Sequence, residues 1–531
     1  MNKNISNIFI VSLLLFAFYC TLQMGMTSDV LFHYGLGKER LDYLLSFGSQ
    51  EISDNITVKK FYPGAYSTIS AFIVQFFPKN YLIEAIYSTN LIFSFFSIIG
   101  IYKVTKELFN EIVGKITFLL CFFNPVFFGH MGINGIDTII SFANIWFLYF
   151  MLRYLRYQNI NQKRNAYIIL GGLCLGLGLG VRYTFFATLL PFALFAFIAL
   201  VSKSNIRGKN FSIKKLFNDF LKLTVISYFF VVLFWPNTHE NIFTMPFKLI
   251  IESFSFGFGV PLLLFNGETF LANTFPKNYL LLSLFYKMPE YIILSILIFV
   301  FFILKKNSLM KKEFKNLYLK ISLILFIILF PNIILLASPY GVYDGIRLFL
   351  YLIPFICIIP ALLLYCLLKE IKFIINKLIL SILVLLKIVF LYSFFILTPY
   401  QYVYSNIFTG NFSENHKKFE NDYWGVSTRK LIAMIEQSDD IPKNKKIIIS
   451  TCGVEKNAQV NYLKKIKNLN FKMVNNYENF DYIIMNNRLI YDEKNLKNYK
   501  NAETCFQRFI GNDLVVIKRN GLIISKITKV K

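Results

Sequence analysis

Long apolar runs separated by short polar segments dominate the first 397 residues of the chain. The first run extends from Ile5 to about Gln23, and further runs are centred near residues 92, 120, 146, 173, 192, 231, 296, 327, 357 and 387. Most of them approach the roughly 20 residues that a helix needs to cross the hydrocarbon of a bilayer. No small-residue cleavage site follows the first run, so we interpret it as an uncleaved helix. The pattern predicts about eleven transmembrane helices.

The pattern changes beyond residue 397, where short strand-like runs replace the long apolar ones. The strand-like runs are Lys446–Ser450, Phe471–Val474, Tyr482–Met485, Leu514–Ile517 and Leu522–Ile524. One helical stretch, near Val460–Ile466, lies between the first two runs. Strands that alternate with a helix predict a small α/β domain. We therefore expect an α-helical polytopic membrane protein with a transmembrane domain over residues 1–397 and a soluble α/β domain over residues 398–531.

Composition supports a membrane protein. Of the 531 residues, 56% are hydrophobic and only 16% are charged, with a mean hydropathy of +0.52, whereas soluble domains carry about 25% charged residues. The net charge of +26 does not predict a nucleic-acid partner, because Lys and Arg lie in short segments between apolar runs, as topology signals do.

The basic segments at residues 153–164, 203–215, 305–315 and 369–377 contain few acidic residues. The alternate loops hold fewer bases and contain the acidic residues Asp29, Asp137, Glu240, Glu252, Glu268 and Asp344. Since short basic loops stay in the cytoplasm, the N-terminus should be cytoplasmic. After eleven crossings, the C-terminal domain should lie outside.

Five of the seven cysteines lie inside apolar runs, where they behave as small hydrophobic residues. Only Cys452 and Cys505 fall in the polar tail. They could form a disulfide if the tail faces an oxidising compartment. Two unpaired thiols are an equal alternative, because sequence does not give their separation.

The first outward loop places Asp29 within about a turn of the membrane boundary, with His33 four residues later. On a helix, side chains at this spacing share a face. Burial raises the cost of ionising a carboxylate, which makes Asp29 a candidate general base. A helix cap without a chemical role is the alternative.

The second outward loop, Asn124–Asp137, contains His130 and Asn134 and turns through a proline and three glycines before the next helix. Asp137 opens that helix, where Asp is a good N-cap. The same helix start could instead orient an acceptor or a phosphate-bearing donor.

The loop Ser338–Arg347 ends in Tyr343, Asp344, Gly345, Ile346 and Arg347. Arg presents a planar, permanently charged fork for phosphate oxygens, so Arg347 is a candidate ligand of a lipid phosphate. An Asp344–Arg347 ion pair at the interface is the alternative.

No cofactor or metal is expected. The four histidines, His33, His130, His239 and His416, are scattered and form no cluster with cysteines at ligand spacing. The sequence contains no serine-nucleophile elbow, Walker motif or dinucleotide fingerprint.

With these residues in view, the chain resembles the polyprenyl-phosphate-dependent glycosyltransferases of the GT-C fold, the bacterial relatives of protein O-mannosyltransferases and lipid A aminoarabinose transferases. The resemblance is carried, in the family's order, by Ser28–Gly35 (SDVLFHYG), Asn124–Asp137 (NPVFFGHMGINGID), Tyr343–Pro354 (YDGIRLFLYLIP), Pro399–Asn406 (PYQYVYSN) and Phe419–Ser427 (FENDYWGVS). Two positions depart from the family pattern. Val30 stands where the family has an acidic residue, and Leu348 where it commonly has His.

The resemblance implies inverting transfer of a sugar from a polyprenyl-phosphate donor to an acceptor protein, lipid or glycan on the outer face of a bacterial inner membrane. It assigns the base to Asp29 and an acceptor-orienting or base-assisting role to Asp137. Arg347 and, more weakly, Arg182 become the candidates for the donor phosphate. The candidates for substrate positioning are His33, His130, Asn134, Tyr343 and Asp344.

Two other classes of function fit the apolar pattern. A lipid or solute transporter would place charged residues near helix centres, which here are nearly free of charge. The interpretation as a noncatalytic membrane assembly protein stays open, because Val30 and Leu348 depart from the family pattern. The long loop Trp235–Lys287, interrupted by four prolines, is expected to lie along the membrane and cover the donor.

Overall fold

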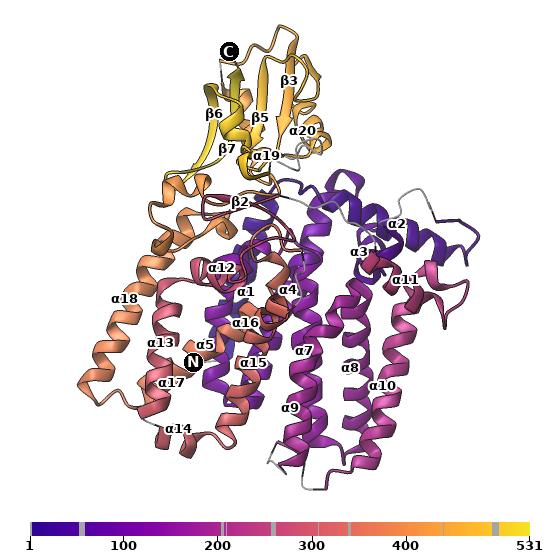
Figure 1. The fold of residues 1–531 in the computed structure, drawn as a ribbon, viewed down its shortest axis with the longest axis vertical. Coiled ribbons are helices and arrows are strands. Elements are labelled where there is room, and N and C mark those ends of the chain that lie inside the picture. Colours follow the sequence, from indigo (N-terminus) through magenta and orange to yellow (C-terminus); the bar gives the residue numbers. More distant parts are fainter. Residues whose placement is uncertain are drawn as a thin grey trace.

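The computed structural model describes residues 3–52, 59–202, 206–208, 210–255, 262–305, 307–337, 341–438, 440–490 and 499–530. Most of the chain forms a bundle of long helices, with a small sheet at one end and the short helix α14 (Asn307–Glu313) at the other (Figure 1). Three of the basic loop residues, Lys203, Lys209 and Lys306, lie outside the described residues, as do Ser338–Tyr340 of the third loop.

The first half of the bundle begins at α1 and ends at α10. Its helices are α1 (Lys3–Gln23), α2 (Val30–Leu45), α3 (Ala65–Val74), α4 (Leu82–Leu108), α5 (Glu111–Phe122), α6 (Pro125–His130), α7 (Asp137–Tyr157), α8 (Asn161–Val181), α9 (Leu190–Val201) and α10 (Ile213–Leu233), with short 3₁₀ turns η1 (Lys59–Phe61), η2 (Lys79–Tyr81), η3 (Tyr183–Leu189) and η4 (Pro236–Thr238). Of these, α2 and α3 lie at the end of the bundle nearest the sheet (Figure 1).

The second half contains a β-hairpin, the remaining long helices and the turns that lead to the sheet. Its elements are α11 (Met245–Ser255), β1 (Leu262–Phe265), β2 (Glu268–Leu271), α12 (Tyr279–Lys287), α13 (Glu290–Lys305), α14, α15 (Leu317–Ala337), η5 (Arg347–Phe349), α16 (Leu352–Ile356), α17 (Ile358–Lys369), α18 (Ile374–Ile396), η6 (Gln401–Val403), η7 (Ile407–Thr409) and η8 (Phe412–Lys417). The antiparallel hairpin of β1 and β2 was not predicted.

Eight helices of the described residues are long and apolar enough to span a membrane, or nine if α12 and α13, bent by 114°, count as one span. The predicted class of helical polytopic membrane protein is confirmed, but the long spans number fewer than the predicted eleven. All eleven apolar runs contain helix. Outside the eight, the run near residue 296 is α13 of the bent pair, the first run counts as a shorter apolar helix over Asn7–Gln23, and the run near residue 120 is divided.

The run near residue 120 is divided because its sequence starts a new helix. Asn124 accepts a hydrogen bond from the backbone N–H of Phe127 at 3.1 Å and so caps α6. Pro125, at the first position of α6, has no N–H to continue the ladder of α5. Only 12 residues of α5 precede the break.

The C-terminal sheet has five strands in the order β4-β3-β5-β7-β6. Its elements are α19 (Thr428–Ala433), η9 (Met434–Gln437), β3 (Ile447–Cys452), α20 (Lys456–Leu463), β4 (Phe471–Met473), β5 (Tyr482–Asn486), α21 (Cys505–Arg508), β6 (Gly511–Arg519) and β7 (Leu522–Val530). Parallel pairing of β3 with β4 and β5 places the crossover helix α20 between β3 and β4, while β7 pairs antiparallel with β5 and β6. The predicted α/β character is confirmed.

The sheet domain is seated on the segment between α1 and α2. The backbone N–H of Met26 donates to Tyr462 Oη at 2.5 Å, and the N–H of Gly25 donates to the Val426 carbonyl at 2.8 Å. One continuous cluster of buried apolar side chains extends from the helices into the sheet. The domain therefore contacts the loop between α1 and α2, in which Asp29 lies.

Candidate active site

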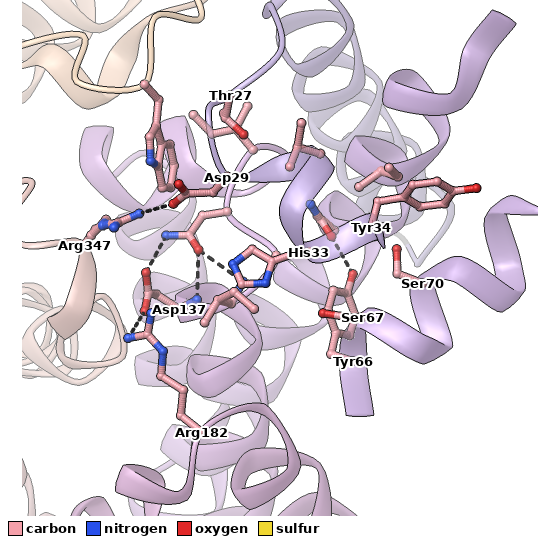
Figure 2. A pocket seen from close by; sticks show the side chains of 18 residues that line it. Thr27, Asp29, His33, Tyr34, Tyr66, Ser67, Ser70, Asp137, Arg182 and Arg347 are labelled. Carbon is pink, nitrogen blue, oxygen red and sulfur yellow. Dashed lines mark hydrogen bonds and ion pairs between the residues drawn. The ribbon is translucent and has the colours of Figure 1, made fainter. Parts of the chain in front are cut away.

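A cavity lies where α2, α3, α4, α7 and α8 converge (Figure 2). These elements meet at the end of the bundle that carries the sheet (Figure 1). Segments from across the chain contribute to its lining. Six of the nine side chains singled out from the sequence line this cavity: Asp29, His33, Asn134, Asp137, Arg182 and Arg347.

Asp29 immediately precedes α2, but its carboxylate makes no cap hydrogen bond to that helix. Instead, Arg347 Nη1 donates to Asp29 Oδ2 at 2.9 Å, and 42% of the Asp29 side chain stays exposed. Burial acts to raise the pKa of this carboxyl, but the charge and hydrogen bond of Arg347 outweigh burial and hold the pKa below its ordinary value. Asp29 is therefore ionised at neutral pH and has room for a substrate hydroxyl.

Arg347 lies between two carboxylates. Its Nη2 atom is 3.0 Å from Asp344 Oδ2, so the Asp344–Arg347 pair expected as the alternative exists alongside the contact with Asp29. The ring centroids of Tyr343 and Trp424 lie 4.8 and 4.9 Å from the guanidinium carbon Cζ of Arg347. Only 7% of the Arg347 side chain is exposed. The guanidinium is thus a buried, fixed cation at the cavity wall.

Asp137 is the first residue of α7, and its side chain is 4% exposed. Asn134 Nδ2 donates to Asp137 Oδ2 at 3.0 Å, and Arg182 Nη1 lies 3.2 Å from Oδ1. The cap role expected for Asp137 belongs to Asn134, whose Oδ1 accepts from the backbone N–H groups of Ile136 and Asp137 at 3.2 and 2.9 Å. Asp137 and Arg182 form a second ion pair in the same cavity.

His33 faces the cavity one turn after Asp29 in α2, as the spacing predicted (Figure 2). Burial lowers the pKa of His33 to about 4 despite the attraction of Asp29. The imidazole is therefore neutral at physiological pH. Its Nδ1 atom is buried and makes no hydrogen bond to any described residue, which leaves a polar atom for a substrate to contact.

The remaining three predicted residues stand outside this cavity. Both Tyr343 and Asp344 contact the Arg347 guanidinium, Tyr343 through its ring and Asp344 through its carboxylate. His130 lines a neighbouring cavity, where its Nε2 atom is 2.6 Å from Tyr423 Oη. The structure thus separates His130 from Asp29, although both come from loops that the sequence predicts to face outward.

Sequence reasoning missed two residues at the site. Trp424, which lines the cavity, lies in a segment quoted for the family resemblance, so that motif could have indicated it. Arg488 reaches Asp344 from the sheet domain, with Nη2 3.2 Å from Oδ1. No local pattern distinguishes Arg488 from the other basic residues of the tail.

The long loop of residues 235–287 contains no single spanning helix, and its residues 256–261 lie outside the described part. The Tyr279 hydroxyl at its end donates to the Gly345 carbonyl at 2.9 Å, next to Arg347. Phe275 and Tyr279 are already buried. That the loop covers a donor stays a prediction.

The described residues contain no group of three or more His, Cys, Asp or Glu side chains placed to hold a metal ion. The two carboxylates of the cavity, Asp29 and Asp137, each face an arginine. This arrangement suits a negatively charged ligand, because a phosphate can replace a carboxylate as the partner of an arginine.

Comparison with known proteins gives one family match. Residues 65–235, about a third of the chain, match the dolichyl-phosphate-mannose-protein mannosyltransferase family. No curated protein matches the sequence.

Three solved structures show the range of structural likeness. ArnT from Cupriavidus metallidurans in the apo state has a TM-score of 0.50 and 11% identity over 99% of this chain and 98% of that one. ArnT bound to undecaprenyl phosphate has a TM-score of 0.48, 10% identity and the same coverage. The oligosaccharyltransferase AglB from Archaeoglobus fulgidus, in complex with an inhibitory peptide and a dolichol-phosphate, has a TM-score of 0.48 and 11% identity. The match covers 91% of this chain and 70% of that one.

The chain therefore has the GT-C fold, which confirms the predicted fold class. It is similar to glycosyltransferases with polyprenyl-phosphate-linked donors, which confirms the predicted resemblance and favours a transferase over a transporter.

Proposed function

We propose that the chain is an inverting glycosyltransferase that moves a monosaccharide from a polyprenyl-phosphate donor to an acceptor hydroxyl. The observation that carries the proposal is the pairing of Asp29 with Arg347 at the wall of one cavity. A carboxylate that accepts a proton and a cation that stabilises a departing phosphate are the two groups this reaction needs.

The donor supplies a good leaving group, so one displacement is sufficient. The acceptor hydroxyl gives its proton to Asp29 while its oxygen attacks the anomeric carbon from the face opposite the phosphate. The bond from that carbon to the phosphate oxygen breaks, and the charge on the released polyprenyl phosphate faces Arg347. A single displacement inverts the anomeric configuration.

Arg347 connects donor binding to the base. In the structure its Nη1 atom contacts Asp29 Oδ2. A donor phosphate that approaches the guanidinium competes for this hydrogen bond. Asp29 then loses the cation that lowers the pKa of its carboxyl, and it becomes the stronger base when the donor is in place.

The second ion pair is assigned to binding. Asp137, held by Asn134 and Arg182, would orient the acceptor, and Arg182 would contribute to the field around the donor phosphate. Neutral His33 would hydrogen-bond a sugar or acceptor hydroxyl through its unpaired Nδ1 atom. We infer a mannose-like hexose as the sugar, from the name of the matching family alone. The acceptor is a protein, lipid or glycan.

The cavity is proposed to face the outside of a bacterial plasma membrane. It lies at the end of the bundle that carries the sheet, whereas α14, within a basic segment, lies at the opposite end (Figure 1). Because basic loops stay in the cytoplasm and disulfides persist in oxidising compartments, the Cys452–Cys505 disulfide of the sheet domain supports the same orientation. Residues 1–397 would form the transmembrane catalytic domain and residues 398–531 the external one.

The test uses purified protein in nanodiscs with a panel of undecaprenyl-phosphate monosaccharides and membrane extract as the source of acceptor. Release of undecaprenyl phosphate is followed for wild type, Asp29→Asn and the control Asp42→Asn. Asp42 is in the same helix but forms an exposed pair with Lys38. Release by wild type and Asp42→Asn that is lost in Asp29→Asn supports the proposal. No release by folded wild type with any donor contradicts it.

A further inference from the structure

Arg488 connects the sheet domain to the candidate catalytic pair. It follows β5, and its Nη2 atom is 3.2 Å from Asp344 Oδ1. The other oxygen of the same carboxylate, Oδ2, is 3.0 Å from Arg347 Nη2. Arg347 in turn contacts Asp29. Four side chains of alternating charge thus extend from the external domain to the proposed base.

Asp344 is the shared member of this row, and its side chain is 4% exposed. A buried carboxylate is costly unless charged or hydrogen-bonded partners satisfy it. Here its two oxygens are divided between Arg347 and Arg488. Asp344 has φ +54° and the following glycine φ +65°, so the turn adopts a left-handed conformation that Asp tolerates better than most residues. The turn presents the carboxylate to both arginines at once.

The backbone of Arg488 is held on both sides. Its N–H donates to Asn486 Oδ1 at 3.1 Å, and its carbonyl accepts from the Cys505 N–H at 2.9 Å. Cys505 is bonded to Cys452 at the end of β3. Asn486 is itself fully buried and donates to the Gly453 carbonyl at 3.0 Å. The Arg488 side chain thus extends from a backbone segment that hydrogen bonds and a neighbouring disulfide hold in place.

Two further contacts fix the Arg488 side chain. Its Nη1 atom donates to the Tyr423 carbonyl, and the Glu420 carboxylate lies close enough to attract its charge. Tyr423 and Glu420 belong to the segment that leads into the sheet domain, next to Trp424, which lies over Arg347. Arg488 therefore contacts the segment that surrounds the guanidinium of Arg347.

We propose that Arg488 is a positioning residue for the transferase reaction, through which docking of the sheet domain sets the placement of Arg347 against Asp29. By sharing Asp344, Arg488 leaves Arg347 divided between two carboxylates. Without Arg488, Asp344 attracts Arg347 alone, and the guanidinium moves away from Asp29. This inference rests on the proposed function.

The test compares Arg488→Gln, Arg488→Lys and the control Arg508→Gln in the full-length protein in nanodiscs. Arg508 is an exposed arginine of α21 in the same domain, so its substitution removes the same charge away from Asp344. Steady-state release of undecaprenyl phosphate gives kcat and KM for each variant, and kcat/KM is measured across pH. The amount of folded enzyme is determined by size-exclusion chromatography.

We expect Arg488→Gln to lower kcat about 10- to 100-fold per folded enzyme, the range for residues that orient catalytic groups from behind. The acid limb of kcat/KM should move to higher pH, because the groups facing Asp29 are Arg347, His33 and, at longer range, Arg488, whose positive charge favours the carboxylate. Arg488→Lys should recover part of kcat, since it restores the charge but not the fork.

Two outcomes contradict the inference while leaving the proposed function intact. The first is wild-type kcat and pH profile in Arg488→Gln. The second is a loss of folded protein with unchanged kcat in what remains, which would make Arg488 a structural residue only. Absence of release by folded wild type instead contradicts the proposed function, and the inference with it.

Discussion

Arg347 donates a hydrogen bond to Asp29 at 2.9 Å across a separation of 318 residues. The arginine leads into η5, before the late helices of the bundle, and the aspartate precedes α2. Because both side chains also line the cavity, this contact defines the centre of the proposed site.

Replacing Arg347 by Gln should reduce kcat about 100- to 1000-fold, the cost of removing one group that stabilises developing charge. Arg347→Lys should recover little of this, because an ammonium group lacks the fork that contacts Asp29 and Asp344 together. Release of undecaprenyl phosphate under saturating donor measures kcat. Full activity in Arg347→Lys would show that only the charge matters.

The pH dependence of kcat/KM should follow Asp29. The carboxyl has a lowered pKa in wild type, so the base is ionised above that pKa and the rate should hold down to mildly acidic pH. In Arg347→Gln the largest influence that offsets the burial of Asp29 is lost, so the pKa of Asp29 rises and the acid limb should move to higher pH. Rate measurements from pH 4 to 8 on a donor with a fixed charge test this, and an unmoved limb would mean that another group limits the rate.

Asp137→Asn should destabilise the protein by about 3–5 kcal/mol, the range for breaking a buried pair and leaving a charge behind. Arg182, 21% exposed and 3.2 Å from Asp137, loses the carboxylate that neutralises its charge in the cavity. Asp137→Asn combined with Arg182→Gln should recover part of the loss in thermal unfolding. If the double variant is no more stable than the single one, the pair does not account for the cost.

The Cys452–Cys505 disulfide should be present in the purified protein. Five cysteines are free in the structure, so thiol titration of denatured protein should give five groups before reduction and seven after it. Replacing both Cys452 and Cys505 by Ser should lower the stability of the sheet domain by about 2–4 kcal/mol, because a loop of 53 residues is no longer closed in the unfolded chain. Cys174→Ser is the matched control, and equal unfolding of the two variants would contradict the expectation.

The sequence by itself determined the class of protein and most of the long helices and C-terminal strands of its fold. Apolar runs of the length that a bilayer requires indicated the helices, and the strand-like runs of the tail indicated the sheet, because both signals depend on neighbouring residues. The sequence also predicted that Asp29, Asp137 and Arg347 stand in outward loops and belong to the site.

Only the tertiary structure decided how these residues are paired. A carboxylate in a loop can cap a helix or meet a distant cation with the same local sequence, and packing chose Arg347 for Asp29 and Arg182 for Asp137. Packing likewise brought Cys452 and Cys505 to a Cα separation of 5.8 Å, where sequence had left two alternatives. Arg488 meets Asp344 only because the sheet domain is seated on the bundle. Such contacts depend on chain segments far apart in sequence, which local patterns of hydrophobicity and charge do not encode.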